Sequence, residues 1–402
     1  MIANILIFLF ILKTGGIVSQ VFSTQVTIII VMLSMVLFQK ISIKEFLKLI
    51  GLITLVYSIF VINHALSDYT YKTYIIYFYT SIVAVYFLNK KILLINSLEK
   101  ILYFILLHSF INYFIVLFHL YILQLPFESV YEIKEQVMTL FYIFNYYQPF
   151  ESYGGIFGLP RNIGLFWEPG LLQIYLNLYL FILFFIKNED LNKKSILAIV
   201  ALFITQSTTG LIIMSMIIFV KYFKLTKKSI EYFIIFSIIF ILAVYPYIAN
   251  KLFGDLIGSG LVRVSDMYIS YKIFVDNFLF GYGFEYFNQD KYFELYKFYM
   301  YDIVSYLNIP IFVIDEIIKS KSGSTHDYLK IGAVYGVLIF SAFNYGWYKF
   351  GKLFSDKAWL FLIIIVLFVS LEPIGTAPFM VFLMMYGLTS LSKKLIYRGR
   401  QV

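Results

Sequence analysis

Apolar runs of membrane-spanning length recur along almost the whole chain, which is the pattern of a protein that crosses a membrane many times. The chain is 61% hydrophobic and 14% charged, far from the averages of soluble domains. The sequence therefore predicts an all-α polytopic membrane protein, a single integral membrane domain over residues 1–402 with about 12 transmembrane helices. The expected segments are 2–12, 17–38, 46–63, 71–89, 101–123, 163–186, 195–206, 208–222, 231–248, 327–349, 358–371 and 376–392.

The orientation of these segments depends on whether 195–206 and 208–222 form one long helix or a hairpin. With a hairpin, most Lys and Arg residues fall in connections on one side, such as Lys90, Lys187 and Lys349. One long helix would split the basic clusters between both sides. Because positive charges stay in the cytoplasm, we favour the hairpin, with both termini cytoplasmic. The first segment has no basic region before it and no cleavage site after it, so we interpret it as a retained helix.

Two long connections, 124–162 and 249–326, then fall on the outer side of the membrane. Neither is a polybasic lipid-binding patch. Within the second, aromatic and aliphatic residues recur at helical spacing, which is typical of a helix lying at the membrane interface. These residues are Tyr268, Tyr271, Phe274, Val275 and Phe278.

Several classes of site are excluded by what the chain lacks. It has no cysteine, which rules out disulfides and thiolate metal ligands. It also has no Walker A motif, no HExxH motif and no Asp-x-Asp pair in an outer connection. We therefore expect no metal and no cofactor. The net charge of +9 is explained by the cytoplasmic connections and does not indicate a nucleic-acid partner.

Arg161 and Glu168 flank the start of the sixth segment. Glu168 precedes Pro169, which biases Glu168 away from helical backbone and makes Pro169 a suitable first helical residue. A helix from Pro169 to Ile186 would be ~27 Å long, enough to span the membrane. Irregular backbone before it is tolerated only inside protein or beside a water-filled cavity, and an acidic residue there is a candidate functional group. The alternative is an Arg161–Glu168 ion pair that fixes the start of the helix.

Arg263 lies in a glycine-rich stretch of the second outer connection. A guanidinium group binds phosphate through two parallel hydrogen bonds and stays charged. Two such groups on the outer side, Arg161 and Arg263, suit a diphosphate ligand. Taken alone, Arg263 would be interpreted as a surface residue that contacts lipid headgroups.

His326 opens the tenth segment, and a histidine there has a pKa suited to a general base. Asp327 follows directly and Lys330 lies one turn further along the same face. The alternative is a histidine and an aspartate that simply begin a helix. Gly332 and Gly336 have the spacing of closely packed helices and indicate packing rather than chemistry.

Three further residues are expected to line the same cavity as His326 and Glu168. Glu372 repeats the Glu-Pro pattern at the outer end of the eleventh segment, while Asp327 and Tyr282 adjoin the histidine and the Gly281–Gly283 turn. Ser207–Gly210 is interpreted as the turn of the hairpin. His108 and His119 lie eleven residues apart on one helix face and are interpreted as hydrogen-bonded core groups.

At these residues the chain resembles the O-antigen polymerase and O-antigen ligase superfamily of bacterial envelope glycan assembly. Three loose motifs carry the resemblance: Arg161 to Pro169, Arg263 to Phe284 with its Gly-x-Gly turn, and His326 to Gly336. The order of the motifs and the single large outer loop before the histidine agree with that family's layout. The motifs cover only some of the chain, whereas the layout covers most of it.

The resemblance implies transfer of an oligosaccharide from undecaprenyl diphosphate, without metal, on the outer face of the bacterial inner membrane. Arg161 and Arg263 would bind the diphosphate, and His326 would orient or deprotonate the acceptor hydroxyl. Glu168 is an alternative base, and spacing does not rank the two. Other implied partners are membrane lipid and a polysaccharide chain-length regulator.

Polymerase and ligase differ in their acceptor, which is a second lipid-linked repeat unit in one case and lipid A core in the other. We favour the polymerase. The competing hypothesis from another class is a lipid-linked oligosaccharide flippase, but transporters often show internal repeats and ionisable groups near the midplane. Here no repeat is visible and the ionisable groups gather at the outer ends.

Overall fold

The computed structural model describes most of the chain, and every structural statement here concerns the described residues. Those residues are 1–63, 68–117, 125–127, 136–140, 142–148, 160–222, 257–283, 294, 297–299 and 327–390.

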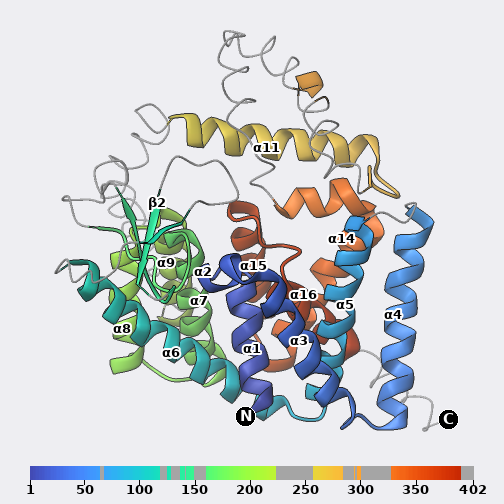
Figure 1. The fold of residues 1–402 in the computed structure, drawn as a ribbon, viewed down its shortest axis with the longest axis horizontal. Helices are drawn as coiled ribbons and strands as arrows, with labels where there is room; N and C mark the ends of the chain where they lie inside the picture. Colours follow the sequence, from blue (N-terminus) through green and yellow to red (C-terminus); the bar gives the residue numbers. More distant parts are fainter. Residues whose placement is uncertain are drawn as a thin grey trace.

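Helices make up nearly all of this structure (Figure 1). The N-terminal helices are α1 (Ile2–Lys13), α2 (Ile17–Val21), α3 (Ser23–Phe38), α4 (Ile43–Asn63), α5 (Asp68–Phe87) and α6 (Lys91–Leu117). The central ones are α7 (Pro169–Phe181), continued by the π-helix η2 (Ile182–Ile186), then α8 (Lys193–Thr205), α9 (Thr208–Tyr222) and α11 (Ile257–Asp276). The last three are α14 (Asp327–Phe354), α15 (Ala358–Leu371) and α16 (Pro378–Thr389).

The mainly helical, apolar structure fits an all-α membrane protein, but it does not reproduce the expected count of about 12 spans. In the described ranges, three helices are long and apolar enough to cross a membrane: Lys91–Leu117, Pro169–Ile186 and Asp327–Phe354. Most other apolar segments form helices of 10–17 residues, short of the ~20 that a bilayer requires. Segment 17–38, for example, is divided at Phe22 into α2 and α3. Segment 231–248 lies outside the described residues.

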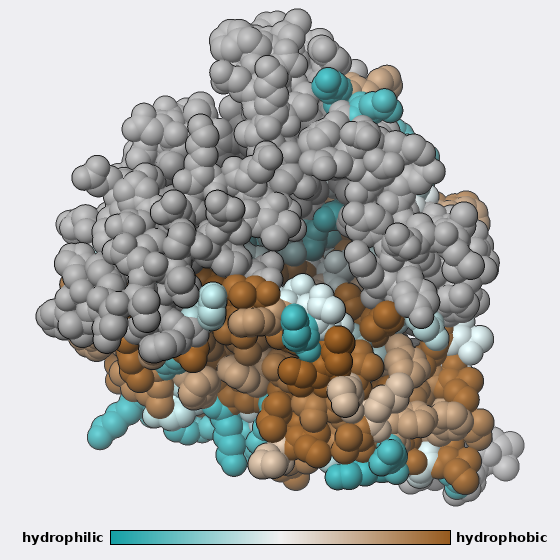
Figure 2. All heavy atoms as spheres, in the orientation of Figure 1, coloured by the Kyte–Doolittle hydropathy of each residue, from teal (hydrophilic) through white to brown (hydrophobic). Residues whose placement is uncertain are grey.

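Hydropathy in the surface view agrees with this assignment. Figure 2 shows apolar side chains across the middle of the described surface and hydrophilic ones along its lower edge. Large apolar residues such as Met32, Phe104 and Ile111 are exposed on α3 and α6. Soluble proteins rarely expose so much contiguous apolar surface, whereas lipid accepts it.

A small antiparallel sheet departs from the expected all-α fold. Its strands, in the order β1–β2–β3, are Leu125–Phe127, Gln136–Leu140 and Phe144–Gln148. The Asn112 side chain of α6 holds β3, since it accepts a hydrogen bond from the Asn145 N–H (2.7 Å) and donates one to the Asn145 carbonyl (3.1 Å). The sheet lies within the outer connection 124–162, where short strands carry too weak a pattern to be found by hydropathy.

The helix α7 is enclosed by other helices. Every residue from Pro169 to Phe181 is buried, including the polar residues Gln173 and Asn177. It packs against α6, α8 and α9. Its face toward α1 carries Tyr175, whose hydroxyl donates to the Ile11 carbonyl (3.4 Å).

The α8–α9 pair is a hairpin, as the distribution of basic residues predicted. Asn192 caps α8 through a capping box, and Gln206 turns the chain in a left-handed conformation (φ 51°) before α9. Lys194 at the start of α8 and Lys221 at the end of α9 lie at the same end of the bundle. Lys194 donates to Glu99 on α6, and Lys221 donates to Asn188 in the loop after η2.

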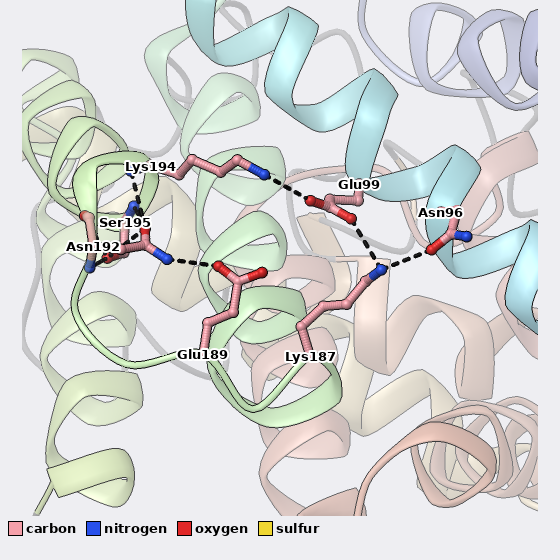
Figure 3. A network of polar contacts seen from close by, with 7 residues as sticks. All are labelled: Asn96, Glu99, Lys187, Glu189, Asn192, Lys194 and Ser195. Atoms are coloured by element: carbon pink, nitrogen blue, oxygen red, sulfur yellow. Dashed lines mark hydrogen bonds and ion pairs between the residues drawn. The ribbon is translucent and has the colours of Figure 1, made fainter.

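Glu99 is the hub of a polar network that joins α6 to the loop between η2 and α8 (Figure 3). Its two carboxylate oxygens pair with Lys187 and Lys194, each at 3.1 Å. Lys187 also donates to Asn96 (2.7 Å). We name this end of the bundle, with Lys187, Lys194 and Lys221, the basic end.

Removing Glu99 should destabilise the protein more than removing either lysine. Glu99→Ala leaves two ammonium groups facing each other at a carboxylate site that is only 17% exposed. We expect a loss of about 1–3 kcal/mol, against less than about 1 kcal/mol for Lys194→Ala. Thermal unfolding in detergent measures the difference. Equal losses for the two variants would contradict the hub assignment.

The helix α14 is broken at Gly336, where the backbone adopts φ 72°. The turn after α11 occupies the break: the N–H groups of Tyr282 and Gly283 donate to the carbonyls of Ala333 (2.7 Å) and Val334 (3.0 Å). Val337 N–H in turn donates to the Phe278 carbonyl (2.8 Å). We name this set of hydrogen bonds the clasp. It supplies hydrogen-bond partners for backbone groups that the break removes from the helix.

The two glycines of α14 have different roles. Gly332 allows close packing, as predicted, because a Cβ atom there would lie 2.9 Å from the Phe274 ring of α11. Gly336 instead allows the left-handed backbone and the close approach of Leu279 and Phe280. The spacing of the two glycines therefore predicted close packing correctly at both positions and missed the helix break at Gly336.

Gly336→Ala should be destabilising, because an L-residue is strained at φ 72° and its Cβ would meet the backbone of the clasp. We expect a loss of at least about 2 kcal/mol. The matched control is Gly51→Ala in α4, where nothing lies within 4 Å of the added Cβ. That change should be neutral or stabilising by up to about 1 kcal/mol. Unfolding temperatures of the two variants in detergent decide the matter, and similar values would refute the clasp.

Candidate functional site

The candidate site lies at the end of the bundle opposite the basic end, where α7, α9 and α14 begin. We name it the site end. The prediction that α7 starts at Pro169 is confirmed, with Glu168 as an extended N-cap residue (φ −139°, ψ 147°). The preceding stretch, Arg161–Glu168, is irregular, as the Glu-Pro pattern indicated. It turns at Gly164 (φ 57°).

This irregular stretch is paired with other backbone on its α1 side. Ile17 N–H donates to the Leu165 carbonyl (3.1 Å), and Trp167 N–H donates to the Gly15 carbonyl (3.3 Å). Phe166 is fully buried between them and stacks on Tyr175. The stretch therefore meets the requirement that irregular backbone in a membrane protein be surrounded by protein.

Asparagine side chains fix its other side. Asn162 donates through Nδ2 to the Ser109 carbonyl on α6 (2.9 Å) and accepts from Gly164 N–H (3.1 Å). Asn145 of β3 donates to the Gly164 carbonyl (3.1 Å). Neither asparagine was expected at the site from the sequence. A sequence signal for such a role is a polar amide among apolar residues. Asn112, within the apolar segment 101–123, is an example.

Arg161 is held by the end of α8 and not by Glu168. Its Nε donates to the Thr205 carbonyl (3.3 Å) and its Nη2 to the Gln206 carbonyl (3.4 Å). The interpretation as an Arg161–Glu168 ion pair is wrong, since both residues are described and no such pair forms between them. Helix C-terminal carbonyls carry partial negative charge and attract a guanidinium. Among the described residues, the other N–H donors of the half-buried guanidinium engage no protein acceptor.

Glu168 is half-buried at the start of α7. Its carbonyl accepts from Leu171 N–H (3.2 Å), but its side chain makes no cap hydrogen bond. Within the described part of the chain, no ion pair engages its carboxylate. A carboxylate at a helix N-terminus is stabilised by the helix dipole without a partner of opposite charge.

Glu372 reaches the same helix start from the end of α15. It is buried, 6% exposed, with extended backbone (φ −133°, ψ 140°). Its carboxylate packs directly on Gly170, where a Cβ atom would overlap it. The structure thus brings Glu372 beside the first turn of α7, next to the residue pair Glu168–Pro169. The cavity that Glu372 is expected to line with Glu168 and His326 stays a prediction.

Asp327 ties α14 to the loop that carries Glu372. Its Oδ2 accepts from Gly375 N–H (2.9 Å), and its Oδ1 pairs with Lys330 Nζ (3.0 Å). Asp327 is 3% exposed. The predicted proximity of Asp327 and Lys330 is confirmed, and Asp327 has a structural role at the start of the helix.

Arg263, His326 and Tyr282 complete the set of predicted residues. Arg263 lies on α11, which crosses the site end (Figure 1), and only its backbone is described. His326 lies outside the described residues, directly before Asp327. Tyr282 donates its backbone N–H to the clasp, and its half-buried ring packs against the core. Convergence of Arg161, Arg263 and His326 remains a prediction.

Comparison with protein-family models, curated proteins and solved structures gives no match. The resemblance to the O-antigen polymerase and ligase superfamily therefore stays a prediction from sequence motifs and layout.

Lys13, at the end of α1, adds a basic group to the site end. Its Nζ donates to the Ser23 carbonyl (3.2 Å), and burial lowers the pKa of its ammonium group. Gly15 and Gly16, which pair with the irregular stretch, follow two and three residues later. In the described residues, no three His, Asp or Glu side chains gather to hold a metal ion.

The remaining polar outliers are structural in different ways. Ser207 makes the hairpin turn, as expected, and its hydroxyl accepts from Gly210 N–H (3.4 Å). His108 is buried and stacks on Phe144 at 5.1 Å, but in the described structure neither ring nitrogen has a hydrogen-bond partner. The interpretation of His108 as a hydrogen-bonded core group is therefore wrong. His64 and His119 lie outside the described residues.

A double-mutant cycle tests the packing of Glu372 on Gly170. Gly170→Ala should destabilise the protein by about 1–3 kcal/mol through overlap with the carboxylate, although alanine favours helix by about 1 kcal/mol. In a Glu372→Ala background the overlap disappears, so the same change should be neutral or stabilising. Unfolding temperatures in detergent give the coupling. Additive effects would show that the two residues do not touch.

Proposed function

We propose that this chain is a membrane glycosyltransferase, a polysaccharide polymerase that extends glycans carried on undecaprenyl diphosphate. Donor and acceptor would both be lipid-linked repeat units, and transfer would need no metal. The proposal rests on the sequence resemblance and on one observation, the placement of Arg161. This guanidinium has no carboxylate partner in the described structure and is held at the site end by two helix-end carbonyls.

A guanidinium that is oriented by backbone carbonyls and pairs with no carboxylate among the described residues supports an anionic ligand at the site end. The Thr205 and Gln206 carbonyls fix the plane of the group without neutralising its full charge. A diphosphate offers oxygens at the spacing that the remaining N–H donors match. Arg263 is proposed as the second guanidinium, from α11 above the same end.

The proposed reaction is a single displacement at the anomeric carbon of the donor. The acceptor hydroxyl oxygen forms a bond to that carbon, and the bond from the carbon to the diphosphate oxygen breaks. The diphosphate leaves with the electron pair, and arginine stabilises its developing charge. The hydroxyl proton passes to a base, which is His326 or Glu168. No nucleotide is required, since the donor carries its own leaving group.

The proposed membrane arrangement follows the distribution of charge. The basic end faces the cytoplasm of a bacterial inner membrane, with both termini on that side and about 12 crossings. The site end then faces outward, where lipid-linked units are presented. Helices too short to span alone would cross with their flanking residues or in a locally thinned bilayer.

Reconstitution with undecaprenyl-diphosphate-linked repeat units tests the proposal. We expect a ladder of products without added metal or nucleotide, and at least about 100-fold slower extension with Arg161→Ala. Arg161→Lys should keep part of the activity, because it retains the charge but loses the planar fork. The control is Lys44→Ala, an exposed change on α4 at the basic end, which should leave extension unchanged.

Other outcomes of this experiment identify the alternatives. Transfer only to lipid A core would indicate a ligase. Movement of lipid-linked units between leaflets without new glycosidic bonds would indicate a flippase. Full product length with Arg161→Ala, in protein that unfolds at the wild-type temperature, would reject the proposed role of the guanidinium.

A further inference from the structure

The helix α11 carries its apolar residues on the outside. One ridge of the helix and the turn that follows consist of large apolar side chains that are 47–60% exposed. These side chains are Met267, Tyr271, Val275, Phe278, Leu279 and Phe280. The first four recur at intervals of three to four residues and so form one continuous stripe along the helix. We name all six side chains the outer stripe.

The opposite face of α11 buries polar groups in its first half. Ser265, Asp266 and Ser270 are at most 3% exposed. In its second half the buried face is apolar, with Phe274 packed against Gly332 and Phe340 of α14. A helix on the surface of a soluble protein shows the reverse, with polar residues outward. The outer stripe therefore favours an apolar medium on that side of α11, although Ile269 and Ile273 are buried too and Asp276 is exposed at its end.

The outer stripe is continuous with a helix that is long enough to cross the membrane. Through the clasp, Val337 N–H donates to the Phe278 carbonyl (2.8 Å), which places Leu338 of α14 beside the end of the stripe. Leu338 is itself 58% exposed. Whatever covers the lipid-facing side of α14 at this level thus also covers the outer stripe.

The flank of α11 has the composition of a membrane interface. Lys272 Nζ lies 5.7 Å from the centre of the Tyr268 ring, and both residues are half-buried. Tyrosine and lysine lie at headgroup level with their apolar parts in the hydrocarbon and their polar ends in water. Asp276, at the end of the helix, accepts a hydrogen bond from the Tyr299 hydroxyl (2.6 Å).

We propose that α11 lies in the plane of the membrane, with the outer stripe immersed in the acyl chains of the leaflet at the site end. The occupant of the stripe is bulk lipid. The stripe ends beside the exposed Leu338 of α14, a helix long enough to cross a membrane, so one apolar medium would cover both. The proposal does not depend on the proposed enzymatic function.

Immersion of α11 has a consequence for the helix it holds. The clasp joins the end of α11 to the break in α14, so a helix anchored in one leaflet keeps a second, crossing helix broken at Gly336. The polar face of α11 is meanwhile turned toward the bundle.

Spin labels on single cysteines test the proposal, since the natural chain has no cysteine. The full chain is reconstituted in phosphatidylcholine and phosphatidylglycerol vesicles with a label at Met267→Cys, Tyr271→Cys or Val275→Cys. We expect high collision with oxygen and low collision with a water-soluble nickel chelate. The lipid control is Ile111→Cys on α6, and the water control is Leu191→Cys in the loop before α8, two positions of equal exposure.

Each other result would overturn the proposal. Nickel accessibility at the three stripe positions equal to that of Leu191→Cys would show that the stripe faces water. Low accessibility to both reagents with dipolar broadening would show that a second copy covers it, and without broadening that another part of this chain does. Ser270→Cys, a near-isosteric change on the buried face, should resist labelling. Rapid labelling there would show that α11 is turned the other way.

Discussion

Backbone hydrogen bonding is the constraint on which this structure depends. In an apolar bundle, every N–H and C=O that leaves a helix has to find a partner within the protein. The chain leaves helical backbone at two important places, the stretch before Pro169 and the break at Gly336. At the first, asparagine side chains and the α1–α2 connection supply the partners. At the second, the clasp supplies them.

These two solutions also explain where the polar side chains lie. Helix ends expose N–H groups at their starts and carbonyls at their ends, and side-chain charges gather there in a matching pattern. Glu168 and Glu372 lie beside the start of α7, whereas Arg161 lies beside the end of α8. Asp327 begins α14 and fixes the loop that carries Glu372. In the described structure the site end is thus a meeting point of helix ends, joined mainly by hydrogen bonds to backbone and by the Asp327–Lys330 ion pair.

Much of the fold could be predicted from the sequence, namely the features that a single strong local signal determines. Apolar length placed most helices, Pro169 placed the start of α7, and the basic residues chose the α8–α9 hairpin. The failures have a common cause, which is that tertiary partners decide them. Gly336 breaks α14 because the turn after α11 fits there, and Arg161 turns to the carbonyls of Thr205 and Gln206 at the end of α8 and not to Glu168. The sheet also depends on a distant partner, Asn112.

The separation of charge at the site end limits how substrates of the proposed reaction could be arranged. A diphosphate is repelled by carboxylates, so it is disfavoured beside the first turn of α7, where Glu168 and Glu372 lie. It is favoured on the side of the α8–α9 turn, where Arg161 presents its remaining donors. An acceptor hydroxyl has the opposite preference, because a carboxylate accepts its hydrogen bond. The donor would therefore lie toward α8 and α9 and the acceptor toward α7 and α15, with the transferred sugar between them.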